Sequence, residues 1–119
     1  MTKEFAMIFA KSWVNSWNSH DLEKILSHFS EDFTIESPMA MKLYPQSKGI
    51  VTGKSEVRKY WKIGLERTPD LKFEILDVLV SVNGLAIYLF NVATNKKSVE
   101  LMLFNSDKKV NKAIVSFSE

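Results

Sequence analysis

The strongest structural signal in this sequence is the stretch VSVNGLAIYLF at residues 80–90. Asn-Gly between two apolar runs is typical of a two-residue β-hairpin turn, because both residues tolerate positive φ. We therefore predict strands over residues 71–82 and 85–94. Two further strand-like runs, 97–105 and 110–117, follow after short polar turns. The C-terminal half is thus predicted to be a four-stranded antiparallel meander.

The N-terminal half has the spacing of helices instead. Over residues 4–18 and 53–68, apolar side chains recur every three or four positions, which is the helical period. A shorter helix is predicted over residues 22–29, after Asp21, whose carboxylate can cap free backbone N–H groups. Helices followed by strands predict an α+β fold, with the three helices gathered on one face of a curved sheet. The 119 residues are enough for one such domain, residues 1–119.

The segment between the second and third helices is less regular. Residues 33–37 alternate with period two and predict a short strand that ends at Pro38. Residues 38–53 contain two prolines and two glycines, so we predict a loop there with a short strand at 49–52. A loop of this length in so small a domain is more often functional than idle.

Composition and charge exclude several classes of protein. The chain has no cysteine, which excludes disulfides, thiol nucleophiles and cysteine-bound zinc. Sixteen Lys and Arg stand against 14 Asp and Glu, an excess too small for a typical nucleic-acid partner. The apolar run at residues 5–10 is too short for a signal peptide or a membrane span. We therefore expect a cytoplasmic protein with no nucleic-acid or membrane partner.

Neither a metal site nor a cofactor is expected. The only histidines, His20 and His28, would lie about 12 Å apart on a continuous helix, too far to share one ion. The sequence has no glycine-rich phosphate loop. Lys54, Arg58, Lys59 and Lys62 lie along one side of the third helix beside Trp61, a pattern found in single-stranded nucleic-acid binding. A solvated helix face explains the same pattern more simply.

Both faces of the predicted sheet are apolar. Residues 85–90 and 101–104 do not alternate between apolar and polar positions, as a half-solvated antiparallel strand should. The three helices can cover only one of these faces. A second copy of the chain is the simplest cover for the other, so we predict a homodimer through the outer sheet face, commonly twofold.

Several motifs resemble one known family. They are WVNSWNSHDL at residues 13–22, FSEDF at 29–33, ESP at 36–38 and the later Tyr60-Trp61. Together with the order of elements, they are similar to the nuclear transport factor 2-like superfamily, in its SnoaL-like and ketosteroid-isomerase-like branch. The resemblance covers essentially the whole chain. It implies a cone-shaped, curved antiparallel sheet wrapped around three N-terminal helices, with a single, largely apolar pocket. It also implies dimers that pack sheet to sheet.

The resemblance does not assign an activity, because the family includes isomerases, polyketide cyclases, epoxide hydrolases, dehydratases and non-catalytic binding domains. In ketosteroid-isomerase-like members, it implies a general base at the position of Ser37. A serine hydroxyl cannot take up a proton at neutral pH without a further base. The position of the oxyanion-binding tyrosine holds Trp13, whose indole N–H donates but cannot ionise. Only the third position, Glu100, keeps its chemistry, so the ketosteroid-isomerase mechanism is unlikely here.

Glu100 is the candidate catalytic residue, with two interpretations. If its face of the strand lines the pocket, desolvation raises the pKa of its carboxyl, which suits a proton donor. Alternatively, it is a solvated glutamate at a strand end, or is paired with Lys96 or Lys97. In the first case, Ser37 or His28 would assist it.

The ligand-binding pocket is predicted from inward alternation on the strands, from the position of Trp13 in the family, and from the loop and helix that would border its mouth. Its predicted members are Trp13, Phe33, Ile35, Ser37, Tyr44, Trp61, Met102, Phe104, Val115 and Phe117. Trp17 and Tyr60 are predicted to be core residues. Asn91 either orients a ligand or satisfies a backbone group.

Three functions remain open. The first is a small dimeric pocket protein that binds a mainly apolar small molecule. The second is an acid–base enzyme of isomerase, cyclase, dehydratase or hydrolase type that uses Glu100. The third is a protein-interaction module with a vestigial pocket. A cavity of several hundred Å³ with Glu100 inside it supports the enzyme, a cavity without inward polar groups supports simple binding, and a filled barrel supports the interaction module.

Overall fold

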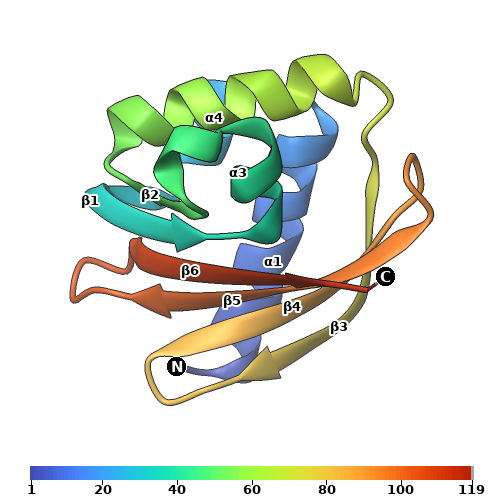
Figure 1. The fold of residues 1–119 in the computed structure, drawn as a ribbon. Coiled ribbons are helices and arrows are strands. Elements are labelled where there is room, and N and C mark those ends of the chain that lie inside the picture. The colour runs from blue at the N-terminus through green and yellow to red at the C-terminus, as the bar shows by residue number, and fades with distance from the viewer. Residues whose placement is uncertain (119) are drawn as a thin grey trace.

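The computed structural model describes residues 1–118 of the chain. The predicted meander forms most of one six-stranded sheet (Figure 1). The strand order is β2-β1-β6-β5-β4-β3. The sheet curves around the helices without closing, which confirms the predicted α+β fold class. The strands are β1 (Phe29–Glu36), β2 (Ile50–Thr52), β3 (Phe73–Val80), β4 (Gly84–Asn91), β5 (Lys96–Phe104) and β6 (Val110–Phe117).

Four helices cover the concave side of the sheet (Figure 1). They are α1 (Lys3–Asn18), α2 (Leu22–Leu26), α3 (Pro38–Leu43) and α4 (Lys54–Arg67). The helix α2 is shorter than predicted, because Phe29 already pairs with Val110 as the first residue of β1. The same helix begins where expected: the Asp21 side chain accepts a hydrogen bond from the backbone N–H of Lys24 at 3.1 Å.

The segment predicted as a loop contains α3, followed by the short helical turn η1 (Pro45–Ser47). The prediction was wrong here because Ser37 and Pro38 act together as a helix start. The Ser37 hydroxyl accepts a hydrogen bond from the Met39 backbone N–H at 3.1 Å, and Pro38 occupies the first helical turn, where no N–H is needed. The predicted strand near 49–52 is present as β2, antiparallel to β1.

The hairpin at residues 80–90 forms, but its turn lies one residue earlier than the Asn-Gly signal. The backbone N–H of Ser81 donates to the carbonyl of Gly84, so Val82 and Asn83 make the turn. Neither Asn83 nor Gly84 has positive φ. Gly84 is required for another reason: a Cβ there would lie 2.2 Å from the carbonyl oxygen of Met102 on β5.

One strand pair is parallel. β1 lies beside β6 with Ile35 opposite Ala113 and Glu36 opposite Ile114, whereas the other neighbours are antiparallel. The long chain segment between β1 and β6 makes this pairing possible, since parallel neighbours cannot be joined by a tight turn. It brings the N-terminal strand against the last strand of the meander and so forms one wall of the interior.

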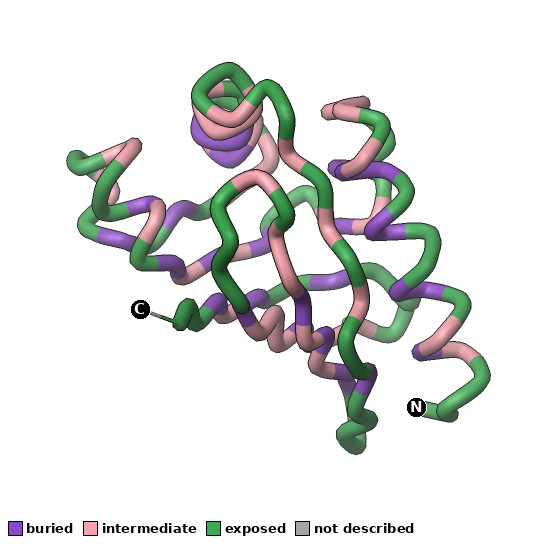
Figure 2. Tube along the Cα trace, turned by 90° about the vertical axis from the view of Figure 1, so that its right-hand side faces the viewer, coloured by how far each residue is buried: buried purple, intermediate pink, exposed green. Residues whose placement is uncertain are grey.

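The interior is divided into two aromatic groups along α1. Near its N-terminus, Phe9 packs edge-on against Phe104, with ring centroids 4.9 Å apart. Near its C-terminus, Trp13 stacks on Phe73 at 5.8 Å, and Trp17 meets Trp61 of α4 at 5.2 Å. Figure 2 views α4 nearly along its axis and shows its buried residues on the side toward the sheet. The two groups leave the middle and upper part of the concave face less densely filled.

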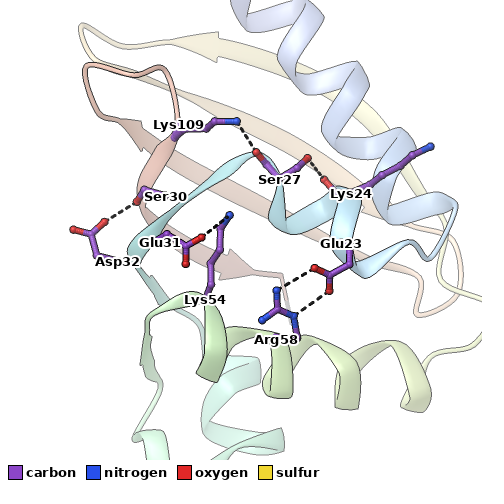
Figure 3. Close-up of polar contacts among 9 residues, drawn as sticks. All are labelled: Glu23, Lys24, Ser27, Ser30, Glu31, Asp32, Lys54, Arg58 and Lys109. Atoms are coloured by element: carbon purple, nitrogen blue, oxygen red, sulfur yellow. Dashed lines mark hydrogen bonds and ion pairs between the residues drawn. The ribbon is translucent and has the colours of Figure 1, made fainter.

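Two basic residues near the start of α4 are paired with acidic residues of neighbouring elements. In Figure 3, Arg58 makes a two-pronged contact with Glu23 of α2, with both N···O distances 3.0 Å. Lys54 reaches Glu31 of β1 at 3.7 Å. Exposed pairs of this kind contribute little to stability, but they orient the helix over β1. Within residues 1–118, no helix is both long and apolar enough to cross a membrane.

Candidate functional site

A cavity of about 290 Å³ lies between the concave face of the sheet and the helices. Its inner part is aromatic and deeply buried, and its outer part is formed by exposed residues. Helices α1, α3 and α4 and the strands supply equal shares of the wall, and connecting segments supply the rest. The residues that line it are Trp13, Trp17, Ile35, Ser37, Met39, Lys42, Leu43, Tyr60, Trp61, Gly64, Thr68, Leu71, Phe73, Asn91, Thr94, Lys96, Ser98, Glu100, Val115 and Phe117.

Most of the predicted site residues lie together in this wall. Glu100 is one of them, and the predicted pocket residues that join it are Trp13, Ile35, Ser37, Trp61, Val115 and Phe117. The structure therefore brings together side chains from α1, α4, β1, β5 and β6 that are up to a hundred residues apart in the chain.

Three predicted pocket residues lie on the inner face of the sheet but not in the cavity wall. Phe33 is packed beneath the wall, 4.5 Å from the Phe29 ring. Met102 is fully buried in the core. Phe104 contacts Phe9 of the N-terminal aromatic group. Alternation along a strand assigned the correct face to each, but α1 crosses that face and fills the end where Met102 and Phe104 lie.

Tyr44 also lies outside the cavity wall. Its hydroxyl donates to Glu56 Oε1 on α4 at 2.7 Å, an interaction that raises the pKa of Tyr44. The same hydrogen bond lowers the pKa of the Glu56 carboxyl. Tyr44 was predicted to border the mouth because the segment was expected to be a loop. As the residue that ends α3, it is held against α4 instead.

Glu100 has an environment that favours its neutral form. It lies between Ile87 of β4 and Val115 of β6 in the register of the sheet, and both neighbours are buried. Part of its surface remains accessible through the cavity, yet burial raises the pKa of its carboxyl to about 8. No salt bridge joins it to Lys96 or Lys97 among residues 1–118, so the interpretation of Glu100 as a solvated or paired glutamate is wrong.

Tyr60 is the second ionisable group of the inner wall. Burial raises the pKa of its phenol to about 12; the Ser37 hydroxyl lowers the pKa and the charge of Glu100 raises it. Tyr60, Ser37 and Glu100 all line the cavity. Because the Ser37 hydroxyl already caps α3, it is positioned as a hydrogen-bonding group and not as a base.

His28 does not assist Glu100, contrary to one of the predicted roles. It lies outside the cavity wall, where Nε2 is 3.1 Å from Ser12 Oγ and Nδ1 is 3.2 Å from the Ile25 carbonyl. Burial lowers the pKa of this imidazole. The histidine therefore links α1 to the end of α2. The apolar stripe of the second helix had suggested a place near the pocket, but the His28 ring packs edge-on against Phe9 of the N-terminal aromatic group.

Several wall residues were not predicted. Trp17 and Tyr60 were assigned to the core; they are buried, and they also border the cavity. Ser98 shares a face of β5 with Glu100, a signal in the sequence that alternation alone could have used. The remaining wall residues that were not predicted are Met39, Lys42, Leu43, Gly64, Thr68, Leu71, Phe73, Thr94 and Lys96.

Polar groups of the wall differ in how they are satisfied. The Asn91 side chain accepts from the Ala93 backbone N–H at 3.1 Å, so the backbone-satisfying role is present. The indole N–H groups of Trp13 and Trp17 are buried and have no hydrogen-bond acceptor among residues 1–118. A buried donor without a partner costs about 1–3 kcal/mol. The wall thus combines aromatic surface with a few unsatisfied or neutral polar groups.

Among the described residues, no group of three or more His, Asp or Glu side chains lies close enough to hold a metal ion. The titratable groups of the wall are Glu100, Tyr60 and the two lysines Lys42 and Lys96. The chemistry available to these residues is hydrogen bonding and proton transfer.

Comparisons with known proteins bear on the fold of the chain. A family model described as a SnoaL-like domain matches residues 10–108. A SnoaL-like protein of unknown function from Burkholderia thailandensis is 34% identical, over 100% of this chain and 99% of that one, with a TM-score of 0.93. No curated protein matches the sequence.

More distant structures share the fold alone. AclR from Streptomyces galilaeus, proposed to be a hydroxylase, is 20% identical over 98% of this chain and 91% of its own, with a TM-score of 0.74. A nuclear transport factor 2-like protein of unknown function from Burkholderia xenovorans is 14% identical over 98% of this chain and 85% of its own, with a TM-score of 0.75.

Proposed function

The chain belongs to the SnoaL-like family, and from this premise we propose that its cavity binds a small, mainly apolar molecule with one hydrogen-bonding group directed toward Glu100. The observation that carries the proposal is a cavity of about 290 Å³ whose inner wall is aromatic and contains a single carboxyl. Small-molecule sites are typically apolar concavities with a few convergent polar groups. The cavity beside Glu100 argues against the third possibility, an interaction module whose interior is filled by side chains.

The chemistry of the inner wall favours a neutral polar group on the ligand. With a pKa of about 8, Glu100 is mostly a carboxylic acid at neutral pH and donates a hydrogen bond. Tyr60 is a phenol at the same pH and also donates. A carbonyl or hydroxyl oxygen is the group that such donors bind.

Calorimetric titration with 2-naphthol tests this proposal, preceded by native mass spectrometry of the purified protein for a co-purified ligand. We expect 2-naphthol to bind with 1:1 stoichiometry per chain. Ser98→Phe, which places a ring in the cavity, should abolish binding. Thr52→Phe on the exposed strand β2 is the matched control and should leave it intact. Equal binding by wild type and Ser98→Phe would mean that the site lies elsewhere.

A second candidate function is acid–base catalysis, and the raised pKa of Glu100 is the observation that favours it. The minor carboxylate form is a stronger base than an ordinary glutamate and can remove a proton from a carbon next to a ligand carbonyl. The carboxylic acid so formed returns that proton to the same or another carbon, so no other co-reactant is consumed. Donors such as Tyr60 would stabilise the enolate oxygen in between.

Deuterium exchange tests the catalytic candidate separately from binding. 2-Tetralone has acidic α-protons and an apolar body, and its exchange in D₂O is followed by NMR. We expect the wild type to accelerate exchange and Glu100→Gln to lose the acceleration while 2-naphthol binding persists. Identical exchange rates with the two proteins would reject the catalytic role and leave simple binding.

We also propose that the chain forms a homodimer, in which each copy buries the outer face of its sheet against the other. Three rows of residues run across β3, β4 and β5 on the side away from the helices (Figure 1). The middle of this face is apolar and only half-buried in the single chain: Ala86, Tyr88, Phe90, Val99, Leu101, Leu103 and Ile114. Exposed apolar surface of this kind on a monomer marks an interaction site.

The charges at the margins of this face suit a second copy of the same chain. Glu74 of β3, Phe90 of β4 and Lys97 of β5 lie in one row, so acidic and basic ends flank an apolar centre. A twofold axis parallel to the strands would place the β3 margin of one copy over the opposite margin of the other. Glu74 and Asp77 would then face the side that carries Lys97 and Lys112.

A further inference from the structure

We propose that the ligand of this cavity is an apolar ring system that carries a carboxylate at its outer end, held by Lys42 and Lys96. The inference rests on the proposed binding function and adds the class of ligand. It starts from the fact that the wall is not uniform in depth. Trp13, Tyr60 and Val115 are buried, whereas Lys42, Thr94 and Lys96 are exposed. The exposed members mark the mouth.

Both formal charges at the mouth are positive. Lys42 comes from α3 and Lys96 from the first residue of β5, so two separate elements each contribute a lysine to the wall of the same cavity. Among residues 1–118, the only acidic side chain of the wall is Glu100 of β5, which lies between buried neighbours on β4 and β6. The two ends of the cavity therefore differ in charge: the inner end has a neutral carboxylic acid, and the outer end has two cationic side chains.

The two lysines of the wall are free of carboxylate partners among residues 1–118, as most lysines of this chain are, and their distinction is that they line the cavity. Lys54, Lys59 and Lys112 each have a carboxylate partner within 4 Å. Lys42 and Lys96 have none among residues 1–118. Glu100 is not their partner either, because burial alone accounts for the raised pKa of its carboxyl and no lysine acts on it.

A ligand that satisfies both ends has a defined chemistry. Its apolar body occupies the aromatic part of the cavity, a neutral oxygen meets the donors around Glu100, and a carboxylate lies between the two ammonium groups. A dianion or a second acid at the inner end is disfavoured, because it would have to displace the proton of Glu100 or lie beside its charge.

The test compares two probes that differ only in charge, 6-hydroxy-2-naphthoic acid and 6-hydroxy-2-naphthamide, by calorimetric titration at low salt. We expect the acid to bind about fivefold to tenfold more tightly than the amide, because each exposed charge pair is worth up to about a factor of five. The double variant Lys42→Gln/Lys96→Gln should lose this preference and bind the amide as the wild type does. Lys11→Gln, on the exposed side of α1, is the control and should keep the preference.

The outcomes separate the two proposals. If the amide binds but the acid is no better, or if the preference survives in the double variant, the carboxylate inference is wrong and the cavity-binding proposal stands. If neither probe binds, both proposals fail. If only the double variant loses the preference, with its circular dichroism spectrum unchanged, the two lysines recognise the carboxylate.

Discussion

Glu100 lies directly opposite Val115 in the β5–β6 register, so a carboxyl that faces the cavity has a buried aliphatic side chain as its neighbour. This relationship raises the pKa of Glu100 to about 8, from an ordinary value of 4.5. The unfolded chain loses this proton at lower pH than the folded chain does. The stabilisation is therefore fully present below about pH 4.5 and is lost as the pH rises through about 8.

We predict that the free energy of unfolding falls between pH 5 and pH 8 with a slope that approaches about 1.4 kcal/mol per pH unit. Urea unfolding at several pH values measures it, and Glu100→Gln, which has no proton to lose, should be free of this component. His28 contributes in the opposite direction at the acidic end, since burial lowers the pKa of its imidazole. The difference between the two proteins removes that contribution. Parallel pH profiles would show that Glu100 titrates normally.

Asn18 is predicted to hold a wall residue in place. Its amide donates to the Phe73 carbonyl at 3.0 Å and accepts from the Phe73 N–H at 2.7 Å, while the Phe73 ring stacks on Trp13. Asn18→Asp removes the donor and sets a carboxylate against a carbonyl. We expect a loss of about 1–3 kcal/mol in unfolding free energy and weaker 2-naphthol binding.

Asn15→Asp introduces the same charge change on the exposed side of the same helix and is the matched control for Asn18→Asp. Chemical denaturation measures the stability of both variants, and calorimetry measures their affinity. Equal effects of the two substitutions would mean that charge, and not the contact with Phe73, is responsible.

Two glycines are predicted to respond in opposite ways to alanine. At Gly84, the new Cβ would lie 2.2 Å from the backbone oxygen of Met102, which cannot move without separating β4 from β5. We expect Gly84→Ala to cost about 3 kcal/mol. At Gly64 in α4, the nearest atom to a new Cβ is Leu43 Cδ1 at 3.9 Å, an ordinary contact. Gly64→Ala should be neutral or should stabilise by up to about 1 kcal/mol. Thermal unfolding of the two variants and the wild type measures these changes in stability.

The proposed dimer predicts the effect of a charge on the outer sheet face. Leu101 lies opposite Ala86 and Ile114 in the middle of that face, so Leu101→Glu should convert the dimer into a folded monomer. Ile8→Glu replaces an exposed apolar residue of α1 and should leave the dimer intact. Light scattering coupled to size exclusion measures the mass of each. A monomeric wild type at micromolar concentration would contradict the assignment of this face.

The sequence predicted the elements whose signal is periodic and local. The helical spacing in α1 and α4 and the apolar runs of β3 to β6 are repeated over many residues, so tertiary context did not override them. The hairpin was predicted from Asn83-Gly84 for a conformational reason, but Gly84 is required by the close approach of Met102. The short helix α3 was missed because one serine and one proline carry its signal.

Alternation along a strand predicts which face a side chain lies on, but not how far along that face the cavity extends. Ile35 and Val115 lie in the wall, whereas Met102, on the same face, lies beneath the part of α1 that fills the cone. The depth at which α1 crosses the sheet depends on contacts between rings, such as Phe9 with Phe104, that no local pattern encodes.

The parallel pairing of β1 with β6 has a consequence for how the chain folds. The meander from β3 to β6 is made of contacts between near neighbours in sequence, whereas Phe29 and Val110 must close a loop of about eighty residues. Such closures are slow, because chain entropy is lost before the contacts form. During synthesis, β1, β2 and α3 therefore wait for β6, and the cavity comes into existence only at that last docking step. A substitution that weakens β6 should slow the appearance of ligand binding more than the appearance of helical structure.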